Sequence, residues 1–264
     1  MKAGRWRGCP RTLLLAVSIG LAGCSSGWPG SGDKAADSPE LASLMRLGTA
    51  AEAAGDTGNA VSVYQRAQTL YPGKSEPSRR LGDLYRARGF HELAATSYEA
   101  AVAADPADRE ARHGLAVALV RQGRLDAAGR EYDTLLAGDG TDIRAWNGRG
   151  VVLDLRGDHP AAWEAFRGGL AVEADSLPLR TNLGLSLALG GKVDEAIAIL
   201  EPAADDPRAG PETRQNLALA YGLAGRTQDA ARLGQKDLKP SDVAQNLDVY
   251  DLMRAVGPKP PAGN

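Results

Sequence analysis

The sequence contains little of what usually carries catalysis, crosslinks or membrane spans. It has two cysteines and three histidines among 264 residues, and aromatic residues make up 5% of it. Its longest apolar run, LLLAVSIGLAG at residues 13–23, is far shorter than the roughly twenty residues of a membrane-spanning helix. So few cysteines exclude a disulfide framework, and the scarcity of cysteine and histidine argues against a zinc site built from them.

The first 23 residues are typical of a secretory signal peptide. The segment MKAGRWRGCPR carries four basic residues and no acidic one, and the short apolar run follows it. The run ends in Leu21-Ala22-Gly23-Cys24, which resembles a bacterial lipobox, where cleavage precedes the cysteine and its thiol receives diacylglycerol. The alternative is an ordinary signal with an incidental cysteine. We expect residues 1–23 to be removed and Cys24 to be lipidated, so that acyl chains hold the protein on a membrane.

A flexible tether is expected after the modified cysteine. Residues 24–40 are rich in Ser, Gly, Pro and Asp, a composition that does not favour regular structure. In lipoproteins with this type of signal, an aspartate after the cysteine often means retention in the inner membrane. Ser25 stands there instead, so the resemblance implies the periplasmic face of the outer membrane, although the inner membrane stays open.

The mature chain is acidic. Removing residues 1–23 takes away four basic and no acidic residues, which leaves 27 basic against 33 acidic and a formal charge of −6. A nucleic-acid-binding surface would require strong positive charge, so this class of partner is excluded. Cys9 leaves with the signal and Cys24 is acylated, so no disulfide remains and packing alone must stabilise the fold.

A period of 34 residues runs through most of the chain. One glycine recurs six times at this spacing, and an alanine follows each glycine by five residues. The glycines are Gly55, Gly89, Gly123, Gly157, Gly191 and Gly225, and the alanines are Ala60, Ala94, Ala128, Ala162, Ala196 and Ala230. Small residues lie seven positions before each glycine and large apolar residues lie nine after it, except at Gly234. Six copies in one register indicate a structural repeat.

The recurring glycine, alanine, small and large apolar positions resemble the tetratricopeptide repeat over residues 41–240. The resemblance implies an all-α, right-handed α-solenoid of about six repeats, each made of two short antiparallel helices. The glycine would adopt a positive φ in the turn, and the small residue would let the second helix approach the first. The large residue would fill the gap between one unit and the next, so that stacked units share one core. The expected units begin at Leu41, Ser75, Arg109, Ile143, Leu177 and Pro211.

The last unit is irregular and needs a cap. Gly234 replaces its large apolar residue, and Asp237 replaces the usual alanine. Residues 241–257 are predicted to form a C-terminal capping helix, started by Ser241 and followed by a disordered tail at 258–264. Its expected apolar stripe consists of Val243, Leu247, Tyr250 and Met253.

No catalytic constellation or metal site is evident in the sequence. His91 and His159 occupy the position that begins a second helix, where packing is the usual role. Gly73-Lys74-Ser75 has the end of a phosphate-binding loop but lacks its first glycine and its preceding strand. The sequence therefore predicts neither an enzyme nor a cofactor.

What remains is a binding surface. The second, fifth, ninth and twelfth residues of each unit are expected to line a concave groove, charged toward its N-terminal end and apolar with amides toward its C-terminal end. The predicted groove residues are Arg79, Asp83, Arg86, His113, Val117, Val120, Asn147, Val151, Thr181, Leu185, Gln215 and Leu219. Such a surface suits a peptide segment of a protein partner. The alternative is that its valines and leucines pack beneath the next helix. A carboxylate clamp is disfavoured, because Asp83, Val117, Val151 and Leu185 stand where that use of the fold needs asparagine.

The C-terminal region resembles one family more closely. Residues 214–225, RQNLALAYGLAG, and residues 236–250, KDLKPSDVAQNLDVY, are similar to the end of TadD, the tetratricopeptide lipoprotein of tight-adherence (Flp) pilus assembly. The resemblance implies a periplasmic, pilotin-like factor on the outer membrane that helps a secretin to assemble or localise. The alternative is a tetratricopeptide lipoprotein that serves another envelope machine, either as a type IV pilus pilotin or as an activator of cell-wall synthesis.

Overall fold

The computed structural model describes residues 38–256, and this part of the chain consists of helices joined by short turns. The predicted signal peptide, lipidated Cys24, most of the tether and the C-terminal tail lie outside the described residues. The helices are α1 (Pro39–Ala53), α2 (Thr57–Leu70), α3 (Ser75–Ala87), α4 (His91–Ala104), α5 (Arg109–Arg121), α6 (Leu125–Gly138), α7 (Ile143–Leu155), α8 (His159–Val172), α9 (Leu177–Leu189), α10 (Val193–Ala204), α11 (Pro211–Leu223), α12 (Thr227–Gly234) and α13 (Pro240–Val256).

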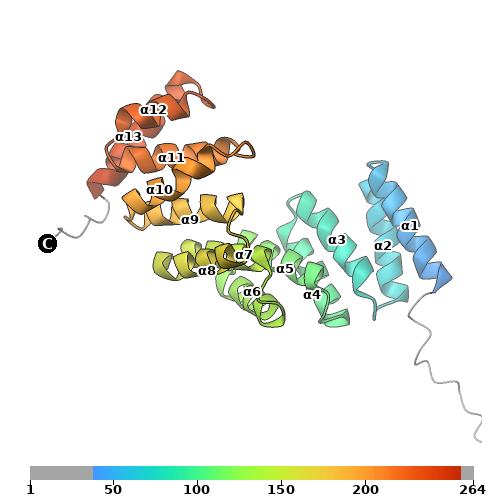
Figure 1. Cartoon of the computed structure of the whole chain (residues 1–264). Helices are drawn as coiled ribbons and strands as arrows, with labels where there is room; N and C mark the ends of the chain where they lie inside the picture. Colours follow the sequence, from blue (N-terminus) through green and yellow to red (C-terminus); the bar gives the residue numbers. More distant parts are fainter. Residues whose placement is uncertain (1–37, 257–264) are drawn as a thin grey trace, which may run out of the picture.

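The helices form six pairs that stack into an elongated solenoid, with α1 at one end and α13 at the other (Figure 1). Five of the six expected unit starts coincide with the first residue of a helix, from Ser75 of α3 to Pro211 of α11. Only the first unit differs, because α1 begins at Pro39, two residues before the expected Leu41. The predicted all-α solenoid of six repeats with a C-terminal cap is confirmed.

The repeating glycines make the turns within the pairs. All six have a positive φ, between 72° and 83°, as the repeat pattern predicted. Helix starts are fixed by aspartates in several repeats: the side chains of Asp56, Asp108, Asp142 and Asp158 each accept a hydrogen bond from the backbone N–H three residues later. These caps satisfy a backbone donor that the helix itself leaves unpaired.

The small residues and the large residues that recur in the repeats pack against each other. All six column alanines are at most 2% exposed. A Cβ at Gly48 would lie 2.2 Å from the ring of Tyr64, and a Cβ at Gly82 would lie 2.6 Å from the ring of Tyr98. The large residue therefore fills space within its own unit, which the prediction had placed only between units. It also reaches the next unit, because Tyr98 lies equally close to Gly114 of α5.

The capping helix α13 supplies large buried side chains at the end of the solenoid, where the last repeat has Gly234 in place of a large apolar residue. Helix α13 packs on α11 and α12. Its Val243 lies against Gly234, and its Tyr250 ring lies so close to Gly222 that a Cβ there would approach it to 2.4 Å. Both side chains are buried, whereas Leu247 and Met253 of the expected stripe are partly exposed.

Ser241 and Asp237, which the sequence analysis singled out near the last helix, both make side-chain hydrogen bonds. The prediction that Ser241 caps the last helix is wrong: the helix begins one residue earlier, at Pro240, and the Ser241 hydroxyl donates to the Asp242 carboxylate at 3.1 Å. Asp237, the departure from the repeat pattern, accepts two hydrogen bonds from the Arg214 guanidinium, at 2.8 and 2.5 Å. This bidentate pair ties the segment before α13 to α11.

Candidate functional site

The first helices of successive repeats lie side by side from α3 to α11. They carry all twelve predicted groove residues. We call the surface formed by α3, α5, α7, α9 and α11 the first-helix face. Its residues differ widely in exposure, so each part is described in turn.

The N-terminal part of the first-helix face is a charged network on α3. The Tyr98 hydroxyl donates to Asp83 at 2.7 Å and accepts from Nε of Arg86 at 3.2 Å. Burial, with Asp83 as acceptor, raises the pKa of Tyr98, so the phenol remains a donor. Arg79 reaches across to Asp108, the N-cap of α5, with an Nε–Oδ2 distance of 3.4 Å. The side chains of Arg86 and Asp83 are 47% and 39% exposed, so their charges are available to a partner.

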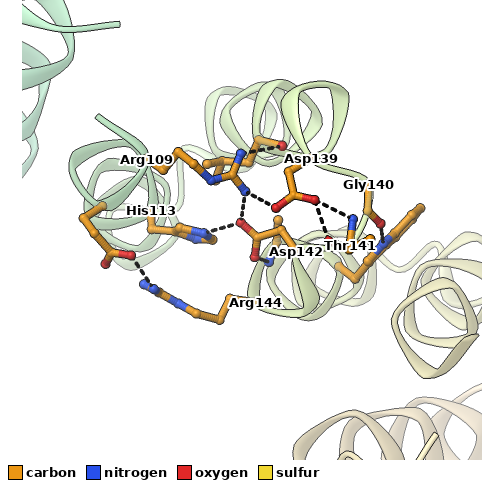
Figure 2. Close-up of polar contacts among 11 residues, drawn as sticks. Arg109, His113, Asp139, Gly140, Thr141, Asp142 and Arg144 are labelled. Carbon is orange, nitrogen blue, oxygen red and sulfur yellow. Dashed lines mark hydrogen bonds and ion pairs between the residues drawn. The ribbon is translucent and has the colours of Figure 1, made fainter. Parts of the chain in front are cut away.

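The middle of the face is organised around Asp142, the N-cap of α7. Figure 2 shows its carboxylate between the side chains of His113 and Arg109, which both come from α5. Nε2 of His113 lies 2.8 Å from Oδ2 of Asp142, and the other carboxylate oxygen accepts from the Ala145 N–H at 2.9 Å. Burial alone would raise the pKa of Asp142, but these hydrogen bonds outweigh it and the pKa is lowered. Beside this cluster, Arg144 donates to Glu110 at 2.7 Å and lowers the pKa of that carboxyl.

The C-terminal part of the face is held by neutral hydrogen bonds. Nδ2 of Asn182 donates to Oδ1 of Asn147 at 2.8 Å, and the hydroxyls of Thr181 and Thr213 lie 3.0 Å apart in a buried position. Val151 is partly buried against the core cluster below it. Leu185, Gln215 and Leu219 are also partly exposed.

In the second to the fifth repeat, the fifth residue has a common role that the sequence analysis missed. Arg79, His113, Asn147 and Thr181 occupy this position, and each one contacts the following repeat through Asp108, Asp142, Asn182 and Thr213 respectively. His113 and Thr181 are each 5% exposed, so these two predicted groove residues lie beneath the surface. Arg79 and His113 each precede their N-cap aspartate by the same interval in the sequence, so the period could have drawn attention to these two pairs but not to those of Asn147 and Thr181.

The accessible part of the first-helix face is therefore smaller than the predicted set. It consists of Asp83, Arg86 and Val117, which is 38% exposed, with the partly exposed edges of the aliphatic residues behind them. Val120 packs against a core cluster that the second, third and fourth repeats share. Charge at one end and small aliphatic area in the middle can bind a polypeptide segment.

The structure also brings together a serine, a histidine and an aspartate that the sequence did not connect. Ser186 Oγ donates to Oδ1 of Asp154 at 2.5 Å, and Nδ1 of His159 lies 2.9 Å from the same oxygen. Ser186 is fully buried and is bonded to the carboxylate, not to the imidazole. A nucleophilic serine needs the imidazole as its base and must reach the substrate. This cluster instead joins α7, α8 and α9.

Family models match two parts of the chain, and both are described as tetratricopeptide repeat. One covers residues 42–74 and the other residues 79–143. The fold is a tetratricopeptide-repeat solenoid. Among curated protein sequences none matches the chain significantly. Within residues 38–256 of the solenoid, no helix has the length and hydropathy to cross a bilayer.

Solved tetratricopeptide proteins share this fold at low sequence identity. PilW, a type IV pilus biogenesis factor, aligns with a TM-score of 0.68 and 16% identity over 81% of this chain and 99% of its own. PilF of Pseudomonas aeruginosa aligns with a TM-score of 0.65 and 14% identity over 80% and 96%. YrrB, which has an unusual peptide-binding site, aligns with a TM-score of 0.54 and 16% identity over 73% and 98%. The tetratricopeptide fold is typically a scaffold for protein interactions.

Proposed function

We propose that this chain is a lipid-anchored periplasmic scaffold for tight-adherence (Flp) pilus assembly. Acyl chains on Cys24 would hold it on the outer membrane, and the first-helix face would bind a segment of the secretin and aid its assembly or localisation. The observation that carries the proposal is the similarity of residues 214–225 and 236–250 to the end of TadD. These residues include the greater part of α11 and of α13, the two helices between which α12 lies at the end of the solenoid.

The fold of two solved pilus proteins supports a role of this general kind. PilF and PilW are both tetratricopeptide solenoids of nearly the same extent as this one. PilW is a biogenesis factor of type IV pili, which keeps a type IV pilus pilotin as the second candidate. The lipobox resemblance supports either machine equally.

Crosslinking in intact cells separates the candidates. After crosslinking and purification through an affinity tag on the mature chain, we expect to recover the Flp secretin. Recovery of a peptidoglycan synthase without a secretin would contradict the proposal and favour the cell-wall alternative. Recovery of only a type IV pilus secretin would move the function to that machine.

A matched pair of variants tests the binding face. Val117→Asp places a charge on the first-helix face, and Val172→Asp places one at a valine of α8, a second helix; the two valines are 38% and 45% exposed. We expect Val117→Asp to weaken secretin recovery about tenfold and Val172→Asp to leave it unchanged, with both proteins equally stable, because neither side chain is core. Equal recovery with both variants would place binding elsewhere.

A further inference from the structure

The second repeat departs from the pattern at the start of its second helix. The residue after each turn glycine is charged in the five other repeats, namely Asp56, Arg124, Asp158, Lys192 and Arg226, but it is Phe90 here. The side chains of Asp56 and Asp158 cap their helices, whereas Phe90 makes no capping bond, and neither do Arg124, Lys192 and Arg226. Phe90 is 53% exposed and Leu93, one turn later, is 50% exposed. This repeat therefore has an apolar residue where the others have a charged one, and it presents two large apolar side chains together.

The surface around Phe90 is concave on two sides. One hollow, of about 180 Å³, is lined by Val61, Leu84, Tyr85, Arg88 and Phe90 together with residues at the start of α2. The other, of about 480 Å³, is lined by Phe90, His91, Glu92, Leu93, Arg121 and Gln122. We call the combined surface the Phe90 patch. It surrounds the turn that joins α3 to α4 (Figure 1).

The charges at the Phe90 patch are not balanced within the protein. Arg88 and Arg121 each line one hollow, and within residues 38–256 neither forms an ion pair, whereas the nearby Arg124 pairs with Glu99 at 3.7 Å. Glu92 is the single acid among the residues that line the two hollows. Guanidinium groups beside exposed apolar area are complementary to a ligand that carries both carboxylates and a large apolar side chain.

We propose that the Phe90 patch is a second docking surface, which binds an acidic peptide segment of a partner protein. An apolar side chain of the segment fills the hollow beside Phe90, and flanking carboxylates pair with Arg88 and Arg121. A bilayer fits this surface less well, because a flat lipid surface leaves concave hollows on either side of Phe90 unfilled. The proposal stands whether or not the pilus assignment is correct.

Fluorescence anisotropy with three labelled peptides tests the proposal on the mature chain carrying Cys24→Ser. The first peptide has a central phenylalanine with three acidic residues on each side; the second has alanine at its centre, and the third has lysine in place of every acid. We expect the first peptide alone to bind, more weakly as salt increases. Arg88→Glu with Arg121→Glu should weaken its binding about tenfold or more.

Phe90→Asp is the decisive variant because it introduces the capping residue found at Asp56 and Asp158. It should weaken binding of the first peptide about tenfold or more while the melting temperature stays equal or rises, so that unfolding cannot explain the loss. Leu155→Asp, at a leucine of α7 that is 56% exposed, is the matched control and should bind as wild type does.

Four results would overturn the proposal. The first is equal affinity of wild type and Phe90→Asp for the acidic phenylalanine peptide, and the second is no preference for it over the lysine peptide. The third is Phe90-dependent binding to phosphatidylglycerol vesicles without peptide binding, which would assign the patch to a membrane. The fourth is a dimer in sedimentation that Phe90→Asp dissociates, which would assign the patch to a second copy of this chain.

Discussion

A single glycine in each repeat sets the turn between its two helices. At Gly157 the φ is +79°, and a Cβ built there would meet nothing within 4 Å. The cost of Gly157→Ala therefore comes from backbone strain alone, and we expect it to lower the free energy of unfolding by about 1–2 kcal/mol. Urea unfolding measures this loss. Gly73→Ala is the control, because it has equally open space without a positive φ; equal losses would contradict the explanation.

Asp142 contributes more than an ordinary helix cap. Its carboxylate caps α7 and also binds His113 and Arg109 of the preceding repeat. Asp142→Asn keeps a capping oxygen but removes the negative charge that accepts from Arg109, so we expect it to lower the free energy of unfolding by about 1–3 kcal/mol at pH 7. Denaturant unfolding measures the change. Asp108→Asn, which also keeps a capping oxygen and loses the charge of one longer ionic contact to Arg79, should cost less. An equal cost at both sites would mean that the His113 and Arg109 contacts add nothing.

The stabilisation by Asp142 depends on pH. Because the folded-state pKa of Asp142 is lowered, its contribution is complete well above the unfolded value of about 3.9 and disappears as the pH falls through the folded value. The difference in unfolding free energy between wild type and Asp142→Asn should therefore shrink in acid. Unfolding curves collected from pH 7 down to pH 3 measure it, and a difference that stays constant would contradict the assigned cause.

At the scale of helices, the cap supplies side chains that the last repeat lacks. Tyr250 of α13 is 9% exposed and lies against Gly222 of α11. We expect Tyr250→Ala to cost about 2–4 kcal/mol, because it removes a large buried side chain and leaves a cavity. Val249→Ala, one residue earlier and 46% exposed, should change stability by less than about 0.5 kcal/mol. Thermal unfolding followed by circular dichroism compares the two; similar losses would show that α13 does not close the core.

The elements themselves were largely predictable, because the repeat acts through backbone geometry and close contacts. Gly157 and its five counterparts predicted the turns within the helix pairs. The period of 34 residues then predicted where each repeat begins. The Ser241 cap failed because Pro240 is tolerated in the first turn and starts the helix itself. The bonds from Arg79 and His113 to the next repeat were not predicted, because the sequence shows the period but not which side chains meet across units.

At the scale of the whole molecule, the acyl anchor and the solenoid have separate roles in the proposed function. Cys24→Ser should leave the helices folded, because the repeats build their core clusters from their own side chains. The variant should bind the secretin in vitro with unchanged affinity but should fail in cells, because confinement to the membrane raises the effective concentration of the binding face. Full activity of this variant in cells would remove the role of the anchor.

The most direct test of the account is the amount of assembled secretin multimer in the outer membrane of cells that lack this gene. The account predicts that multimers are lost, that the wild-type chain restores them, and that the Cys24→Ser and Val117→Asp chains do not. Multimers that remain at the normal level without the gene would contradict the proposed function.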